Sequence, residues 1–175
     1  MARAFISIGS NIDPEINVRA ALRRLGASVR ITAISTVYLT EPVGPPGQPP
    51  FYNCVAELET ELTPRDLKFR LLRRIESELG RARVADTFAA RTIDLDLILY
   101  DELVMTAEDL TLPDPDILAR PFLAVLLHEL APGLVLPGSG VRISEKVPAL
   151  PRTGMKPLVN YTERIRKDLF HERKQ

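Results

Sequence analysis

Residues 91–100 read RTIDLDLILY. The run from Ile93 onward consists largely of apolar residues bounded by polar ones, so it predicts a β-strand. Side chains alternate along a strand, which places Asp94 and Asp96 together on one face. The opposite, apolar face would consist of Ile93, Leu95, Leu97 and Leu99.

Two carboxylates on one face of a strand are suited to binding a divalent cation. Asp94 and Asp96 are expected to lie close enough to hold one ion or a pair, and Mg²⁺ usually takes one or two protein carboxylates and completes its shell with water and phosphate. The alternative is an exposed strand face on which aspartate is tolerated. Because aspartate is a poor strand former, we favour the Mg²⁺ site.

A group of charged residues precedes these aspartates, at the end of a predicted helix and on the loop after it. Its members are Arg73, Arg74, Glu76, Arg81, Arg83 and Arg91. Guanidinium groups beside Mg²⁺ indicate a triphosphate site, because they neutralise charge on a transferring phosphoryl group. For Arg73 and Arg74, a solvated helix face with salt bridges remains an equal alternative.

A proline-rich segment leads to a third set of candidate residues. Residues 41–50, EPVGPPGQPP, hold five prolines and two glycines, so they predict a stiff loop. After this loop, Phe51 offers an aromatic face and Asn53 an amide that both donates and accepts hydrogen bonds, a combination suited to a flat heterocycle. Phe122 fits the same role, and both phenylalanines are equally compatible with a place in the core.

The order of predicted elements indicates an α+β fold. Strands are predicted over residues 4–8, 29–39, 51–62 and 93–100, with helices over 14–25 and 63–79. This βαββαβ order predicts a ferredoxin-like split sheet, mainly antiparallel, with helices on one face. An added hairpin near 101–105 and an added helix over 120–130 complete the prediction.

Local signals predict where the helices begin and end. Asp13 is the expected N-cap of the first helix, and Gly26 is expected to end it with a positive φ. Thr63 and Asp66 resemble a capping box in which aspartate replaces glutamate. Gly80 is expected to end the second helix.

Composition excludes several classes of protein. The 175 residues are 45% hydrophobic and 26% charged with no net charge, as in ordinary globular proteins. Short apolar runs and the lack of a signal peptide predict a cytoplasmic protein that binds neither membrane nor nucleic acid. Cys54 and two histidines, His128 and His171, supply neither a disulfide nor a zinc site nor a catalytic triad.

The chain is expected to form one domain over residues 1–140, followed by a polar extension over 141–175 whose role the sequence does not reveal. The end of this extension, 162–175, could form a short surface helix with Ile165 and Leu169 facing inward. We expect a monomer or a weak homodimer.

Four motifs, in this order, resemble the 6-hydroxymethyl-7,8-dihydropterin pyrophosphokinase family of folate biosynthesis. They are FISIGSN (5–11), EPVGPPGQPPFYN (41–53), RTIDLDL (91–97) and LARPF ahead of ELAP (118–132). The resemblance covers about residues 1–138, and RTIDLDL is its most specific part. It implies a ferredoxin-like domain that moves pyrophosphate from ATP onto the pterin hydroxymethyl group and releases AMP, the pterin hydroxyl attacking the β-phosphorus in line.

The resemblance also assigns site residues. Asp94 and Asp96 would hold two Mg²⁺ ions that bridge the ATP phosphates, and Arg81, Arg83 and Arg91 would act in catalysis from a mobile loop that closes over ATP. The ATP site would include these arginines together with Arg73, Glu76, Asp114 and Arg120. The pterin would lie between Phe51 and Phe122, with further contacts from Thr40, Val43, Asn53, Phe88 and Asp94.

The chain departs from the family pattern at several positions. Asp114, in LPDP (112–115), stands where the family commonly has histidine, and a carboxylate near triphosphate is unfavourable. Phe88 stands where some members carry tryptophan. Two alternatives therefore remain: a catalytically reduced paralogue that binds pterin or nucleotide without transfer, and a ferredoxin-like interaction module whose aspartates are incidental.

Overall fold

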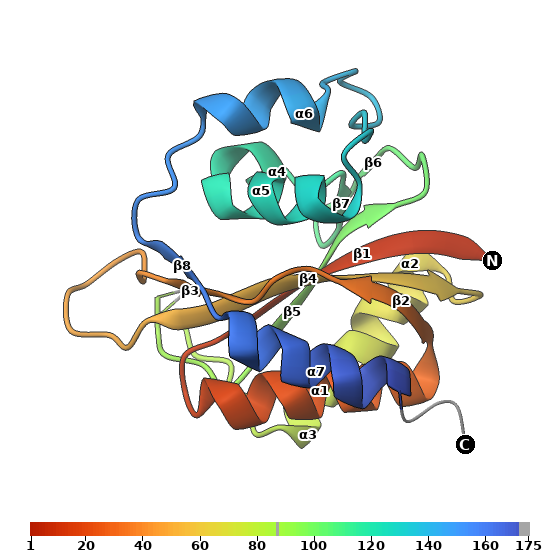
Figure 1. Ribbon diagram of the computed structural model, residues 1–175. Helices are drawn as coiled ribbons and strands as arrows, with labels where there is room; N and C mark the ends of the chain where they lie inside the picture. The colour runs from red at the N-terminus through yellow and green to blue at the C-terminus, as the bar shows by residue number, and fades with distance from the viewer. Residues whose placement is uncertain (87, 172–175) are drawn as a thin grey trace.

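The computed structural model describes residues 1–86 and 88–171, and it has one main β-sheet between two layers of helices (Figure 1). The strands of this sheet are β1 (Ala2–Ser10), β2 (Arg30–Ile34), β3 (Tyr38–Thr40), β4 (Phe51–Thr60), β5 (Asp94–Tyr100) and β8 (Met155–Pro157). A second, two-stranded sheet consists of β6 (Met105–Thr106) and β7 (Thr111–Leu112). The predicted α+β class is confirmed.

Helices cover both faces of the main sheet. Below it in Figure 1 lie α1 (Pro14–Ser28), α2 (Pro64–Asp66), the π-helical η1 (Leu67–Leu72), α3 (Arg73–Glu78) and α7 (Val159–His171). Above it lie α4 (Asp116–Ala119), α5 (Pro121–Leu130), α6 (Ile143–Lys146) and the 3-10 helix η2 (Val147–Ala149). The helices of the predicted βαββαβ unit lie on one face, as expected, whereas the elements after β5 pack on the other face.

The strand order is β5-β1-β4-β3-β8, with β2 also paired to β4, and each pairing is antiparallel. The predicted mainly antiparallel sheet is thus confirmed. β1 lies between β4 and β5, and its register pairs Gly9 with Asn53 on one side and with Asp94 on the other. Three residues distant in sequence therefore lie side by side across the sheet.

A bulge changes the faces of β5. The pairing of β1 with β5 shifts between Phe5 and Ile6, which leaves Ile98 outside the regular register. Leu97 packs in the lower core, whereas Ile98 and Leu99 both pack in the upper core. The prediction that Leu99 shares a face with Leu97 is wrong, because an extra residue in a strand reverses the alternation beyond it.

Several predicted boundaries also differ from the structure. α1 continues past Gly26 to Ser28, and Asp13 has a φ of 41° and makes no side-chain cap. The predicted strand over 29–39 is two strands, and Ser35 lies at the interruption: its N–H donates to the Val55 carbonyl at 2.9 Å, but its hydroxyl accepts the hydrogen bond from the Val55 N–H at 2.9 Å. The hairpin forms between β6 and β7 rather than directly after β5.

The second helix begins as predicted but contains an unexpected turn. Thr63 Oγ1 accepts a hydrogen bond from the Asp66 N–H at 3.1 Å, which confirms the cap. Beyond Asp66 the helix is π-helical, and the Arg73 N–H donates to the carbonyl of Lys68, five residues earlier. Such wider turns occur frequently at functional sites.

The two faces of the sheet have separate cores, and residues after 140 contribute to both. Ile165 and Leu169 of α7 are buried in the lower core, as the sequence predicted. Ile143 and Val147 are buried in the upper core. Among the residues that the structure describes, no helix is long and apolar enough to cross a membrane.

Cys54 provides a test of the lower core. Burial, with a smaller contribution from Glu129, raises the pKa of its thiol from 9.0 to about 12. We expect the thiol reagent DTNB to leave Cys54 unmodified in the folded protein and to label it in urea, because the thiolate is the reactive form. Folding holds the thiol neutral, so its stabilising contribution is complete below about pH 9 and is lost as pH rises towards 12. Rapid labelling of the native protein would contradict this burial.

Candidate active site

Three adjacent strands, β5, β1 and β4, change from apolar to polar residues at the same level on their upper face. In β1, Phe5 belongs to the upper core, whereas Ser7 and Gly9 line an open cleft. In β4, Val55 is in the core, whereas Asn53 lines the cleft. β5 follows the same rule, because Leu99 is in the core and its two aspartates line the cleft. The apolar half of this face packs against α5, and the polar half remains open.

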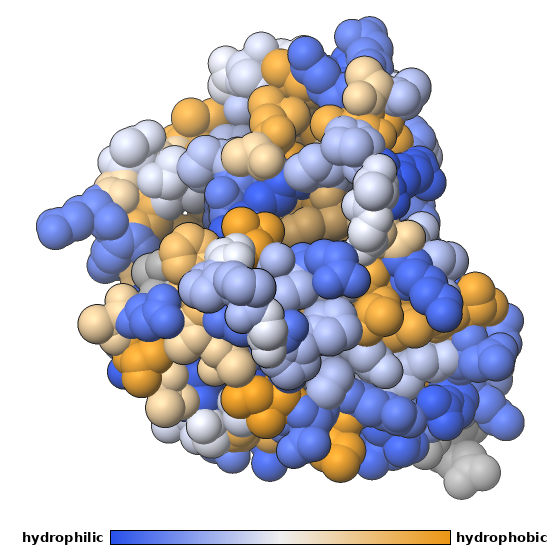
Figure 2. All heavy atoms as spheres, turned by 90° about the vertical axis from the view of Figure 1, so that its left-hand side faces the viewer, coloured by the Kyte–Doolittle hydropathy of each residue, from blue (hydrophilic) through white to orange (hydrophobic). Residues whose placement is uncertain are grey.

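The resulting cleft has a volume of about 510 Å³. It collects nearly all residues that the sequence and the family resemblance proposed, from segments far apart in the chain. They are Thr40, Val43, Phe51, Asn53, Arg73, Arg81, Arg83, Phe88, Arg91, Asp94, Asp96, Asp114, Arg120 and Phe122. Figure 2 views the molecule from the side of the proline-rich loop and shows a surface hollowed between the upper and lower layers, with hydrophilic and hydrophobic patches around it.

Asp94 is held by two arginines. Its Oδ1 accepts a hydrogen bond from Arg81 Nη1, and its Oδ2 accepts one from Arg91 Nη1 at 2.5 Å. Burial raises the pKa of Asp94, but the positive charges of Arg81 and Arg91 outweigh burial and hold the pKa below its ordinary value. Asp94 is therefore a carboxylate at neutral pH.

Asp96 faces the cleft beside Asp94 in a different electrostatic environment. Burial is the main cause that raises its pKa to about 7, and the negative charges of Asp94, Glu76 and Asp114 raise it further. Lys68 acts in the opposite direction. A cation between the two aspartates would relieve this repulsion, so the pair fits Mg²⁺ by its charge and by its oxygen ligands.

Glu76 lies behind the arginines. Its side chain is almost fully buried, with 3% of the residue exposed, and it does not line the cleft. Oε1 accepts hydrogen bonds from Arg81 Nη1 at 2.5 Å and from the Leu95 N–H at 2.9 Å, and Oε2 accepts one from Arg83 Nη2 at 2.7 Å. In this structure Glu76 thus connects α3 to β5 and positions two arginines.

The opposite end of the cleft has an aromatic and amide character. Asn53 Nδ2 donates a hydrogen bond to Thr40 Oγ1 at 2.6 Å, which joins β4 to β3. Within residues 1–86 and 88–171, the Thr40 hydroxyl proton and the Asn53 side-chain oxygen have no other hydrogen-bond partner and can bind a ligand. Phe51 and Phe122 also line this end, from β4 and from the first turn of α5.

Two loops meet at the mouth of the cleft. The ring of Phe88 packs against Gly44, where an added Cβ atom would lie 2.7 Å from the ring. Gln48 Nε2 donates a hydrogen bond to the carbonyl of Phe88. Asn11 links the same two loops: its Oδ1 accepts from the Arg91 N–H at 2.7 Å, and its Nδ2 donates to the Pro49 carbonyl at 3.3 Å.

Asp114 has a structural partner. Its Oδ1 accepts a hydrogen bond from the Asp116 N–H at 2.8 Å, at the beginning of α4. Burial, together with the negative charge of Asp116, raises the pKa of Asp114 above its ordinary value, although this hydrogen bond and the positive charges of Lys68 and Arg120 act in the opposite direction. One carboxylate oxygen is therefore used by the backbone, and charges of both signs act on the residue.

Sequence reasoning missed some of the lining. These residues are Ser7, Gly9, Glu41, Lys68, Leu95, Ile98, Asp116 and Leu123. Lys68 could not be found from α-helical spacing, because the π-helical turn of η1 brings it to the side of the helix that Arg73 also occupies. The place of Gly9 in the cleft could be recognised only from the register of β1.

The sequence matches a family model described as 7,8-dihydro-6-hydroxymethylpterin-pyrophosphokinase over residues 5–132. A protein of Haemophilus influenzae, named 2-amino-4-hydroxy-6-hydroxymethyldihydropteridine pyrophosphokinase, is 40% identical over 144 residues, 81% of this chain and 89% of that protein. A protein of the same name from Pseudomonas aeruginosa is 38% identical over 160 residues, 89% of this chain and 96% of that protein.

Solved structures of Plasmodium falciparum HPPK-DHPS have a similar fold. The wild type with pteroate gives a TM-score of 0.69 at 11% identity and covers 85% of this chain. The wild type with SDX-DHP gives 0.67 at 10% identity and covers 90%. This chain spans 42% and 47% of those two structures, less than half of their length.

Gly9→Ala tests how closely β1 approaches Asn53. A Cβ atom at Gly9 would lie 2.8 Å from Asn53 Oδ1, so the carboxamide must move. We expect a loss of about 1–3 kcal/mol in the free energy of unfolding in urea and a shift of the Asn53 side-chain amide signals. Gly133→Ala is the matched control, because no atom lies within 4 Å of its added Cβ. Equal stability of the two variants would contradict the close approach.

Glu76→Gln tests the buried carboxylate. The variant keeps the size of the side chain but removes the charge that holds Arg81 and Arg83. We expect the free energy of unfolding to fall by about 2–4 kcal/mol, since a buried cation loses a partner. Glu78→Gln on the same helix, whose ion pairs with Arg24 and Arg74 are exposed, should cost less than about 1 kcal/mol. A similar loss in both variants would refute the buried network.

Proposed function

The chain belongs to the 7,8-dihydro-6-hydroxymethylpterin-pyrophosphokinase family, and from this premise we propose how its cleft performs the reaction for which the family is named. The protein transfers pyrophosphate from ATP to 6-hydroxymethyl-7,8-dihydropterin in folate synthesis. One observation carries the assignment of the site: a carboxylate pair with arginines lies next to an aromatic and amide wall in a single cleft.

Asp94 and Asp96 are proposed to hold two Mg²⁺ ions together with the phosphates of ATP. The support is the electrostatics of the pair. Asp94 is charged, and burial and the negative charges around Asp96 raise the pKa of Asp96. When bound, Mg²⁺ neutralises the triphosphate and makes the β-phosphorus more electrophilic.

The arginines are proposed to exchange partners when ATP binds. Arg81 and Arg91 hold Asp94 in the structure, and Arg83 holds Glu76. Phosphate oxygens accept from the same guanidinium donors, and bidentate binding to phosphate is a preferred geometry of arginine. The cations would then stabilise the charge of the transferring group. Arg73 and Arg120 line the same cleft and would contact the nucleotide.

The pterin is proposed to lie between Phe51 and Phe122. The Asn53 carbonyl oxygen and the Thr40 hydroxyl would bind polar groups on the edge of the pterin ring, with Val43 and Phe88 at the mouth. Gly9 lies between Asn53 and Asp94 in the sheet and has no side chain to separate the two halves. The pterin hydroxymethyl group can therefore approach the phosphate side, and positioning supplies much of the catalysis.

Asp114 does not oppose this reading of the site. Its Oδ1 accepts from the Asp116 N–H, and the positive charges of Lys68 and Arg120 partly offset the effects of burial and of Asp116 on its pKa. We therefore do not favour the alternative of a paralogue without transfer activity.

A ferredoxin-like split βαββαβ arrangement is our interpretation of the part up to β5, supported by the order β5-β1-β4 with β2 on the far side of β4. A monomeric or weakly dimeric state, a cytoplasmic location and a division of the chain at residue 140 stay predictions.

Asp96→Asn tests the proposed mechanism. With ATP and Mg²⁺, the unmodified protein should form AMP only when 6-hydroxymethyl-7,8-dihydropterin is present. Loss of one of two metal-binding carboxylates should reduce this rate by at least about 100-fold, because the variant neither holds the metal nor balances its charge. Asp109→Asn, whose carboxylate pairs with the exposed Arg65, should keep the full rate. Full activity of Asp96→Asn would overturn the metal assignment.

A further inference from the structure

The wall that carries Thr40 is a short strand. β3 contains three residues, Tyr38–Thr40, and the proline-rich loop follows it directly. Thr40 must stay in register for its hydroxyl to accept the hydrogen bond from Asn53. Three residues paired on one side alone give few backbone hydrogen bonds, so the position of Thr40 depends on what holds the other side of β3.

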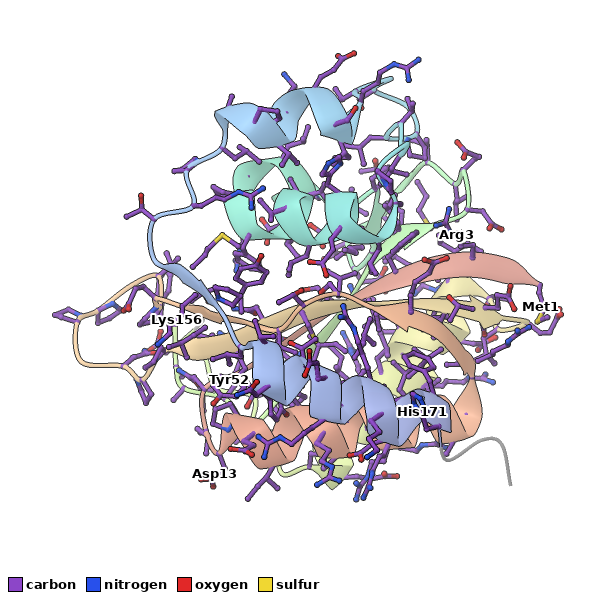
Figure 3. All side chains as sticks on the ribbon, viewed as in Figure 1. Met1, Arg3, Asp13, Tyr52, Lys156 and His171 are labelled. Carbon is purple, nitrogen blue, oxygen red and sulfur yellow. The ribbon has the colours of Figure 1, made fainter. Side chains whose placement is uncertain are left out.

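β8 holds that other side. Its register pairs Thr40 with Met155 and Leu39 with Lys156. The Glu41 N–H donates to the Gly154 carbonyl at 3.3 Å, so Glu41 and Gly154 form a hydrogen-bonded pair. Hydrogen-bonded pairs alternate along an antiparallel ladder, which makes Leu39 and Lys156 the next such pair. In Figure 3, Lys156 lies on β8 at the end of the sheet opposite Met1.

Residues at the beginning of α7 form hydrogen bonds to Val37, the residue before β3. The Leu158 N–H donates to the Val37 carbonyl at 2.8 Å. In return, Thr162 Oγ1 accepts a hydrogen bond from the Val37 N–H at 2.9 Å and donates one to the Leu158 carbonyl at 2.8 Å. Val37 is fully buried and Thr162 is 2% exposed, so water cannot replace these bonds without local opening.

We propose that residues 154–162 position the pterin-binding wall, the side of the cleft that carries Thr40 and Asn53. They form hydrogen bonds to β3 along its outer edge and to Val37, the residue just before it. This inference rests on the proposed function, because Thr40 and Asn53 are taken to bind the pterin. The segment lies beyond the 5–132 region that the family model matches. Its effect should be selective, because the nucleotide half of the cleft is formed by β5, α3, the loop between them and the two ends of α4, whereas β8 pairs with β3.

Two pairs of variants test the proposal. Lys156→Pro removes the backbone N–H that faces β3, whereas Lys156→Ala changes only an exposed side chain. Thr162→Val keeps the shape of the buried side chain but leaves the Val37 N–H without its acceptor, whereas Thr162→Ser restores the hydroxyl. If Lys156→Pro fails to fold, the Thr162 pair carries the test by itself.

The measurement is calorimetric titration of each folded variant with 6-hydroxymethylpterin, in the presence of Mg²⁺ and a non-hydrolysable ATP analogue, together with titration of the analogue alone. We expect Lys156→Pro and Thr162→Val to bind the pterin about tenfold more weakly, the equivalent of one lost positioning hydrogen bond. Binding of the analogue should stay within about twofold, and the alanine and serine controls should match the unmodified protein. Amide exchange over residues 38–41 should accelerate in the two disruptive variants.

Three results would overturn the proposal. The first is unchanged pterin affinity in a variant whose residues 38–41 exchange faster. The second is an equal loss of pterin and nucleotide affinity, which would indicate a general loss of stability. The third is a lack of pterin binding by the unmodified protein, and this result differs from the others because it refutes the proposed function as well.

Discussion

The pairing of β1 with its two neighbours is the constraint on which the rest of the structure depends. β1 lies between β4 and β5, so its register decides which residues of those strands stand side by side. That register brings Asn53, Gly9 and Asp94 into one row. Because glycine adds no side chain to the row, the side of the cleft with the Asn53 amide and the side with the Asp94 carboxylate open into the same space.

The upper face of the sheet then divides into a core and a cleft. Phe5, Val55 and Leu99 pack under α5. Further along the same strands, the residues that line the cleft include Ser7, Asn53 and Asp96, which are polar or charged. Packing a helix over these polar side chains would remove their water at a cost in free energy, so this half of the face stays open. Arg81 pairs with Glu76 and Asp94, and Arg91 also pairs with Asp94. These ionic groups are therefore partly buried without being unpaired.

The C-terminal residues complete this arrangement from outside. They add β8 to the sheet edge and α7 to the lower layer, and Tyr161, Ile165 and Leu169 join a core whose other buried residues come from earlier in the chain. The cleft therefore depends on residues that contact no proposed substrate. In physical terms, a three-residue strand such as β3 becomes a fixed wall only when both of its edges are bonded.

Local chemistry determined what the sequence could predict. The alternation of RTIDLDLILY placed Asp94 and Asp96 on one face, the Thr63 cap marked a helix start, and motif order indicated the family, because each depends on neighbours in the chain. Only the tertiary structure decided the features that depend on distant partners. The bulge at Ile98, the helices on both faces, the π-turn that directs Lys68, the close approach at Gly9 and the bracing of β3 by β8 each arise from packing or pairing between segments that local patterns do not relate.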